Sequence, residues 1–187
     1  MHDVVTFINE IDMGILKGIQ DVFQSDFMDR AMPFITFLGD RGLIWIVISL
    51  MLLITKKYRK AGIIGLMALL ITTLLGEVVI KNLIQRARPF IGMEGLKLLI
   101  TEPTSFSFPS GHTGSSFAVA TALAINIKRY GKYFLILAFL IAFSRLYLFV
   151  HFPSDIAGGI ILGVLSAKIA QAIYNRITDR KNEKTSL

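Results

Sequence analysis

The chain has 187 residues, of which 53% are hydrophobic and only 18% charged, with a mean hydropathy of +0.62. A soluble domain carries about a quarter charged residues, and the apolar residues here form long blocks instead of alternating stripes. This composition excludes an ordinary soluble protein and predicts a membrane protein. Cysteine is absent, which excludes a disulfide framework, a thiolate nucleophile and a cysteine-ligated metal.

The net charge of +7 is concentrated in a few places. Of the 20 Lys and Arg residues, 11 fall in three short stretches between or after apolar blocks, at 56–60, 128–132 and 175–184. Such clusters mark the cytoplasmic side of a membrane protein. We therefore expect the plasma membrane as the location, a cytoplasmic C-terminus and no nucleic-acid partner.

Residues 3–24 form the first predicted element, a helix with two different faces. One face carries Val4, Ile8, Ile11, Ile15, Ile19 and Val22, and the other carries Glu10, Asp12, Lys17 and Asp21. A pattern of this kind is typical of an amphipathic helix that lies in the membrane interface. A further membrane span, packed against its neighbours, is the alternative.

Five apolar segments follow this helix and predict membrane-spanning helices. They cover residues 33–55, 61–80, 112–127, 133–150 and 156–174, and the sequence GDRG at 39–42 interrupts the first. The sequence thus predicts an all-α integral-membrane bundle, with five to six transmembrane helices in one domain, 1–187. Successive spans cross the membrane in opposite directions, and the basic turn at 56–60 is taken as cytoplasmic. Six polar residues then lie at the outer end of the bundle, namely Lys81, Arg88, His112, Arg145, His151 and Asp155. Charged groups beside membrane spans are costly and indicate function.

The sequence KNLIQRARP at 81–89 offers two cations. Lys81 and Arg88 are seven residues apart, so on a helix they would share a face, and two fixed cations suit a phosphate. An ordinary helix boundary, with Lys81 paired to Glu77, is the alternative.

The sequence PSGH at 109–112 precedes a helix rich in small residues. Unpaired N–H groups at a helix start form an anion cradle, to which Ser110 adds a hydroxyl donor and Gly111 a close approach of the backbone. His112 can pass a proton at its rim. A simple helix cap is the alternative.

The sequence SRLYLFVHFPSD at 144–155 adds Arg145 as another cation. Pro153 between His151 and Asp155 predicts a turn in place of a continuous helix. A carboxylate beside His151 would fix the tautomer of the imidazole and leave its other nitrogen free to attack, although Asp155 could also be an N-cap. A zinc site is disfavoured because the neighbouring cations would repel it, and no G-x-S-x-G motif surrounds Ser110.

Together these three motifs resemble the signature of the type-2 phosphatidic acid phosphatase family, with every signature position filled in order across residues 61–174. The resemblance implies a phosphatase without metal or other cofactor, in which His151 forms a phosphohistidine, Asp155 orients it, and His112 protonates the leaving oxygen and then activates water. Phosphoryl oxygens would be bound by Lys81, Arg88, Ser110, the Gly111 amide and Arg145.

The implied substrate is a lipid phosphate, met at the outer membrane face without an obligate protein partner. By analogy with small bacterial members of the family, we expect phosphatidylglycerophosphate first, then undecaprenyl diphosphate, then phosphatidic acid. Soluble vanadium haloperoxidases of the same superfamily are disfavoured by the apolar spans. A lipid-phosphate binding or transport protein is the non-enzymatic alternative, although binding alone needs cations and no oriented nucleophile.

Overall fold

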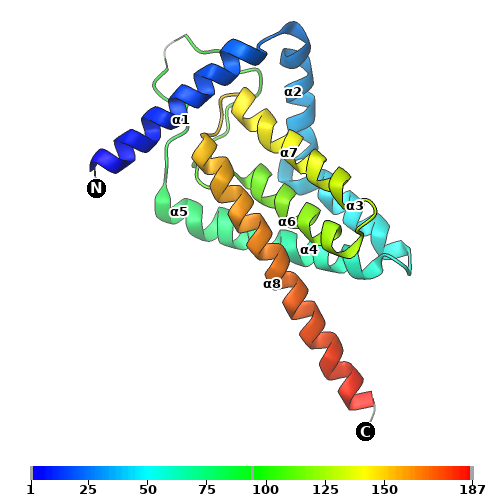
Figure 1. Ribbon diagram of the computed structural model, residues 1–187. Helices are drawn as coiled ribbons and strands as arrows, with labels where there is room; N and C mark the ends of the chain where they lie inside the picture. The colour runs from blue at the N-terminus through cyan, green and yellow to red at the C-terminus, as the bar shows by residue number, and fades with distance from the viewer. Residues whose placement is uncertain (1, 94, 186–187) are drawn as a thin grey trace.

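The computed structural model describes residues 2–93 and 95–185, and every regular element in these two ranges is helical. In chain order the elements are α1 (His2–Phe23), α2 (Asp26–Leu38), the 3₁₀ turn η1 (Asp40–Gly42), α3 (Leu43–Ile54), α4 (Arg59–Thr73), the π-helical segment η2 (Leu74–Ile80), α5 (Lys81–Ile84), α6 (Gly111–Asn126), α7 (Gly131–Tyr147) and α8 (Pro153–Thr185) (Figure 1). The prediction of an all-α fold is confirmed.

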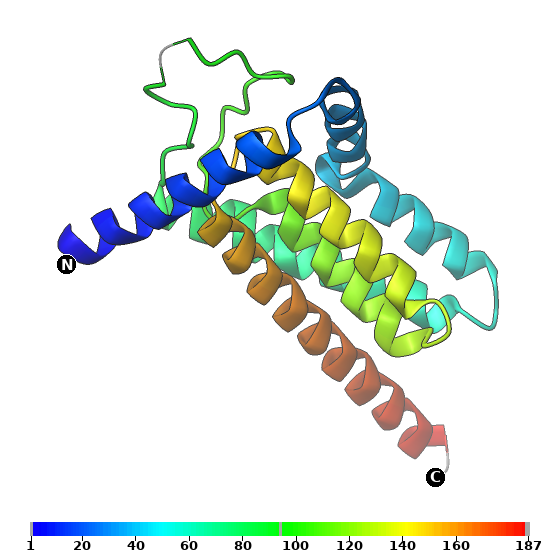
Figure 2. The ribbon, with the colours of Figure 1, turned by 45° about the horizontal axis from the view of Figure 1, so that its top comes forward.

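Helix α6 is the centre of the bundle, packed against α4, α7 and α8 (Figure 2). Its buried residues are mostly small, among them Ala118, Ala120 and Ala122. Small side chains let helix backbones approach closely, which is the usual basis of packing between membrane helices. The closest approach is to α8, where a Cβ on Gly163 would lie 2.6 Å from the Gly114 carbonyl oxygen.

Within the described residues, two helices are long and apolar enough to cross a membrane, Arg59–Ile84 and Pro153–Arg180. The pair Asp26–Leu38 and Asp40–Ile54 would make a third if this chain segment, bent by 44°, is one span. Helices α6 and α7 are shorter, with 16 and 17 residues. The number of five to six spans therefore stays a prediction.

Helix α1 packs against α7 and the start of α8, and one of its faces is buried. That face contains Asp12 and Leu16, which are 3% and 0% exposed, whereas most of the predicted apolar stripe, including Ile8, Ile11 and Ile15, faces outward. The helix is amphipathic as predicted, but an acidic residue belongs to the face that contacts the protein.

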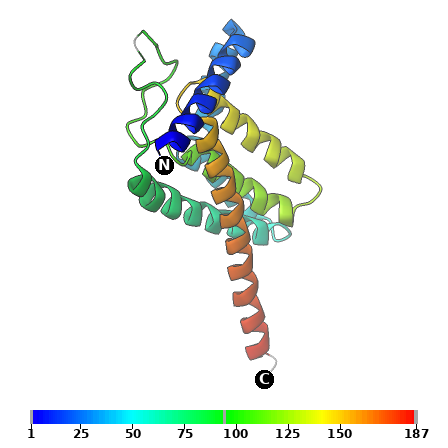
Figure 3. The same ribbon diagram turned by 60° about the vertical axis from the view of Figure 1, so that its left-hand side comes forward.

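The connections between helices gather at the two ends of the bundle. The turns at 55–58 and 127–130 lie at one end, and the long segment 85–110 and the turn at 148–152 lie at the other (Figures 1 and 2). Helix α8 begins at this second end and extends past the first toward the C-terminus (Figure 3). The second end brings all three sequence motifs together.

Candidate active site

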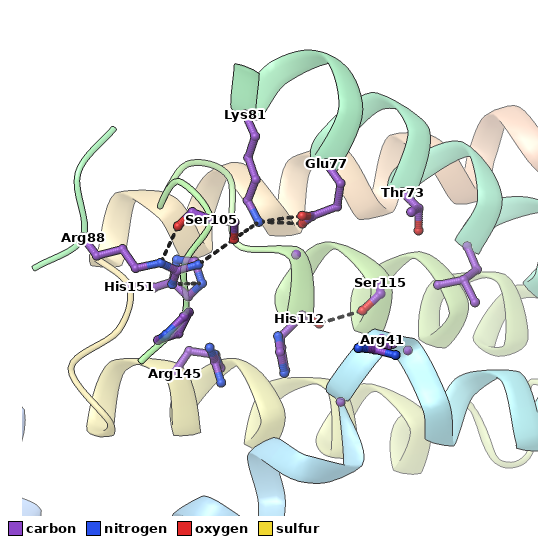
Figure 4. Close-up of a pocket in the computed structure, with 15 residues that line it drawn as sticks. Arg41, Thr73, Glu77, Lys81, Arg88, Ser105, His112, Ser115, Arg145 and His151 are labelled. Carbon is purple, nitrogen blue, oxygen red and sulfur yellow. Dashed lines mark hydrogen bonds and ion pairs between the residues drawn. The ribbon is translucent and has the colours of Figure 1, made fainter. Parts of the chain in front are cut away.

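A cavity of about 360 Å³ opens at the second end of the bundle. Six of the eight predicted site residues line it, namely Lys81, Arg88, Gly111, His112, Arg145 and His151 (Figure 4). Asp155 lies behind His151, and Ser110 lies behind the cavity wall as the buried N-cap of α6. The motifs thus converge as predicted, although they come from α5, α6, α7, the start of α8 and two connecting segments.

The prediction that Lys81 and Arg88 share a helical face is wrong. Helix α5 ends at Ile84, and Gln85 adopts a left-handed conformation with φ of +50° that turns the chain out of the helix. Arg88 then reaches the cavity from the segment 85–110. The two cations still converge, because both donate hydrogen bonds to the Ser105 hydroxyl, at 3.5 Å from Lys81 and 3.1 Å from Arg88.

Lys81 is 5% exposed and donates hydrogen bonds to both carboxylate oxygens of Glu77, at 2.7 and 2.8 Å. This pairing of Lys81 with Glu77 is the alternative expected from the sequence, and Lys81 lines the cavity as well. Glu77 lies on η2 and approaches α6 so closely that a Cβ on Gly111 would lie 2.1 Å from its Oε1 atom. A side chain at position 111 would therefore displace the Glu77 carboxylate from its present position.

Arg88 and Arg145 are the two buried guanidinium groups without a carboxylate within 4.0 Å among the cavity-lining residues described. Arg88 donates to the Val150 carbonyl at 2.8 Å, and Arg145 donates to the Thr36 hydroxyl at 2.5 Å. Among the described residues, Arg145 Nε has no hydrogen-bond partner. Burial lowers the pKa of Arg88 to about 10, so it stays charged at neutral pH. Two buried cations that no ion pair neutralises make this cavity strongly attractive to an anion.

His151 lies in the connection between α7 and α8 and is 1% exposed. The turn predicted from Pro153 is confirmed, because α8 begins at that residue. The His151 Nε2 atom is 3.1 Å from Arg88 Nη1, and because a guanidinium only donates, this contact places the ring proton on Nδ1. Burial lowers the pKa of His151 well below its usual range, against the opposing effect of Asp155, so the imidazole is neutral at pH 7.

Asp155 is fully buried, and its carboxylate accepts hydrogen bonds on both oxygens. Oδ2 accepts from the Ser107 hydroxyl at 2.5 Å and the Phe152 amide at 2.8 Å, and lies 3.5 Å from His151 Nδ1; Oδ1 accepts from Arg86 at 2.7 Å. Asp155 is the third residue of α8 and therefore not the N-cap. Its carboxylate nevertheless accepts a hydrogen bond from the Phe152 amide at the start of the helix, and it also faces the His151 imidazole.

The α6 N-terminus supplies Ser110 and His112. Ser110 Oγ accepts from the Thr113 amide at 3.4 Å and from the Thr113 hydroxyl at 3.0 Å, which is a helix cap, and its role as a phosphate donor stays a prediction. His112 lines the cavity, and its Nε2 atom is 2.7 Å from Asp40 Oδ1. Because a carboxylate only accepts, Nε2 carries a proton and Nδ1 is the atom left for a ligand.

Several residues of the site were not identified from the sequence. Asp40 and Arg41 belong to the GDRG interruption, which was the available signal, and Arg86 lies inside the first motif without being a signature position. Ser105 and Ser107 had no distinguishing pattern. In the part of the chain that the structure describes, no three His, Asp or Glu side chains are grouped as metal ligands.

Comparison with known proteins identifies the same family that the three motifs resemble. The PAP2 superfamily model matches residues 61–179. An undecaprenyl-diphosphatase of Sulfolobus acidocaldarius is 36% identical over 140 residues, covering 73% of this chain and 66% of that protein. Among solved structures, Aquifex aeolicus LpxE has a TM-score of 0.76 at 26% identity, covering 87% of this chain and 95% of its own.

A second structure, the PAP2-type phosphatidylglycerolphosphate phosphatase of Bacillus subtilis, has a TM-score of 0.68 at 27% identity and covers 91% of this chain and 87% of its own. The family match spans more than half of the sequence and includes all three motifs. The protein is therefore a member of the PAP2 superfamily, a membrane phosphatase with a helical fold.

Proposed function

We propose that the protein is a metal-independent lipid phosphate phosphatase that acts through a phosphohistidine at His151. The observation that carries this proposal is the position of His151, which lines the cavity with Nδ1 3.5 Å from Asp155 and Nε2 3.1 Å from Arg88. Two buried guanidinium groups, those of Arg88 and Arg145, border the same space and have no ion-pair partner in the described part of the chain. A nucleophile beside fixed cations is the arrangement that phosphoryl transfer requires.

The reaction would begin with the phosphoryl oxygens held by Lys81, Arg88, Arg145 and the Gly111 amide. Arg88 turns its Nη1 proton from His151 to a phosphoryl oxygen, which frees the Nε2 lone pair to attack phosphorus. The P–O bond to the leaving group breaks as the P–N bond forms, and His112 Nδ1 gives its proton to the leaving oxygen. Asp40 at Nε2 stabilises the doubly protonated His112 before this step.

Hydrolysis of the intermediate would reverse these roles. His112, now neutral at Nδ1, takes a proton from water, and the resulting hydroxide attacks phosphorus and breaks the P–N bond. Inorganic phosphate leaves, and His151 returns to its neutral form with the proton on Nδ1 held toward Asp155. Protons and charge balance in this cycle without a metal ion.

A second cavity supports a lipid as the substrate. It has a volume of about 450 Å³, shares His112 and Arg145 with the first, and continues along Pro33, Phe37 and Ile100. Its lining is largely apolar, and Phe37 is exposed on the outer face of α2. A headgroup phosphate at His151 would thus have an apolar route for its chain on the leaving-group side.

A polyprenyl diphosphate is the substrate we favour. Arg41 lines the first cavity beyond His112 as seen from His151, where the second phosphate of a diphosphate would lie (Figure 4). Arg41 has φ of +51°, a strained conformation for a residue other than glycine and one that often marks functional sites. The similarity to a protein named undecaprenyl-diphosphatase supports the same choice.

Phosphatidylglycerophosphate, which the sequence ranked first, is the second candidate. The structural similarity to the Bacillus subtilis phosphatidylglycerolphosphate phosphatase favours it. In either case we propose that the site faces the extracytoplasmic side, because the basic stretches lie at the opposite end of the bundle.

The test is phosphate release by detergent-purified protein in EDTA from undecaprenyl diphosphate, phosphatidylglycerophosphate and phosphatidic acid. We expect release that His151→Gln abolishes. Arg41→Gln should lower kcat/KM for the diphosphate by about 10-fold, the value of one charge-assisted hydrogen bond, and leave phosphatidic acid unaffected. Exposed Arg30→Gln on α2 is the matched control. Tight lipid binding without release would instead favour the non-enzymatic binding protein.

A further inference from the structure

We propose that Arg86 and Asp12 are positioning residues for the Asp155 carboxylate, so that helix α1 completes the active site. Helix α1 lies outside the residues that the family model matches, and none of its residues belongs to the three motifs. The inference rests on the proposed function, because it concerns how His151 is held for attack.

The guanidinium of Arg86 joins two buried carboxylates. Nη1 lies 2.7 Å from Asp155 Oδ1, and Nη2 lies 2.7 Å from Asp12 Oδ2 and 2.7 Å from Asn9 Oδ1. The side chains of Asp12 and Asp155 are 4% and 0% exposed, and that of Arg86 is 18% exposed. The guanidinium also lies 4.0 Å from the centre of the Phe152 ring, which fixes its plane.

Arg86 differs in this respect from the cations that face the cavity. It is not a lining residue there, and both of its terminal nitrogens are occupied by carboxylate, amide and hydroxyl oxygens. Arg88 and Arg145 have no carboxylate within 4.0 Å in the described chain and do line the cavity. Arg86 is therefore placed to act on Asp155 and not on the substrate.

This contact decides which carboxylate oxygen faces the nucleophile. With Oδ1 held by Arg86, Oδ2 is directed toward the Phe152 amide, the Ser107 hydroxyl and His151 Nδ1. A carboxylate held on both oxygens can orient an imidazole and stabilise the charge it gains on attack. Without the guanidinium, Oδ1 would be a buried acceptor with an uncompensated charge, and the carboxylate could rotate away from His151.

Asp12 extends this arrangement to α1. Its carboxylate pairs with Arg86, and its Oδ1 accepts a hydrogen bond from the Ser154 amide at 3.0 Å in the first turn of α8. An acidic group at a helix N-terminus is stabilised by the unpaired amides there. Helix α1 thereby holds both the cation and the helix start that set the position of Asp155.

The experiment compares Arg86→Met, Arg86→Lys and Asp12→Asn with wild type in detergent, using phosphate release from the best lipid substrate. We expect kcat to fall about 10- to 100-fold for Arg86→Met, by analogy with the outer partners of metal-bound histidines, and less for the other two. The competitive inhibition constant of inorganic phosphate should stay unchanged, because Arg86 does not touch the anion. Glu10→Gln, an exposed carboxylate on the same helix, is the matched control and should have no effect.

A double-mutant cycle separates positioning from general stability. If Arg86 acts through Asp155, Arg86→Met should cause no further loss of kcat in an Asp155→Asn background. A further loss of the same size, a raised phosphate inhibition constant, or full activity of folded Arg86→Met and Asp12→Asn would each overturn the inference. If Arg86→Met does not fold, Arg86→Lys and Asp12→Asn replace it in the double-mutant cycle with Asp155→Asn. An inactive wild type would instead refute the proposed function.

Discussion

Each of the two histidines at the site has one ring nitrogen directed toward a carboxylate and the other directed toward the cavity. His112 presents Nε2 to Asp40, whose side chain is 53% exposed, whereas His151 presents Nδ1 to Asp155, which is fully buried. In the proposed mechanism, Asp155 holds the Nδ1 proton of His151 and leaves Nε2 to attack, whereas Asp40 holds the Nε2 proton of His112 and leaves Nδ1 to transfer a proton. Environment thus assigns different roles to the same residue type.

Asp40→Asn tests this division of labour at the residue scale. The amide cannot stabilise a doubly protonated His112, so we expect kcat to fall about 10- to 100-fold while KM changes little. Steady-state phosphate release measures both, with Asp179→Asn, an exposed carboxylate near the end of α8, as the control. A rise in KM with kcat unchanged would show that Asp40 contributes to binding and not to proton transfer.

Residues close in sequence were the easier ones to predict. Arg145, His151 and Asp155 lie within one motif, and their convergence at one site could be predicted from spacing and charge. Asp40 and Arg86 were missed because their partners are 72 and 69 residues away in the chain. An acidic group four residues from a basic one is visible as a pair, whereas a contact made by helix packing has no local signature.

At the scale of single elements, the position of the site depends on how closely α6 and α8 approach. Cβ atoms on Gly159 and Gly163 would lie 2.9 Å from the Ser110 carbonyl oxygen and 2.6 Å from the Gly114 carbonyl oxygen. The two helices carry His112 and Asp155 at their N-terminal ends. Their spacing therefore sets the distance between His112, the proposed proton donor, and Asp155, the proposed orienting group.

Gly163→Ala should accordingly destabilise the bundle, by about 1–3 kcal/mol for an overpacked contact with backbone atoms. The readout is the thermal unfolding midpoint in detergent. Gly14→Ala on α1, where a Cβ would meet nothing within 4 Å, is the matched control and should be neutral or stabilising. Equal midpoints for the two variants would show that α8 can shift away from α6 without cost.

Most helices could be predicted from apolar runs, but the end of α5 could not. Gln85 takes a left-handed conformation without the glycine that usually signals such a stop. The sequence therefore favoured a helix through Arg88, and that error produced the wrong face for the two cations. The π-helical segment at Leu74–Ile80, which carries Glu77, likewise has no sequence signal that we identified.

The whole molecule has two chemically different ends. Lys and Arg clusters at 56–60, 128–132 and 175–184 lie away from the cavity, and the motifs lie around it. The bundle architecture was predictable from hydropathy, whereas the docking of α1 was not, because its buried face is polar at Asp12. A hydropathy pattern identifies the apolar side of a helix but not which side contacts the protein.

Single-cysteine labelling can test this orientation directly, because the chain contains no cysteine. An impermeant maleimide added to intact cells should label Lys97→Cys, near the cavity end, and should label Lys57→Cys and Arg129→Cys only after permeabilisation. The reverse pattern would place the site in the cytoplasm. Labelling of Lys57→Cys and Arg129→Cys from opposite sides would rule out an even number of spans between them.

The most direct test of the central claim is to trap the phosphoenzyme. Wild type and His112→Gln, mixed with lipid substrate carrying a labelled phosphoryl group in EDTA and quenched in alkali, should hold label on His151. His112→Gln lacks both the acid for the leaving oxygen and the base that activates water, so it should gain the label more slowly and, in a chase with unlabelled substrate, lose it more slowly than wild type. The label should be stable in alkali and lost in acid, and absent from His151→Gln. Turnover by His151→Gln, or label on another residue, would contradict the phosphohistidine route.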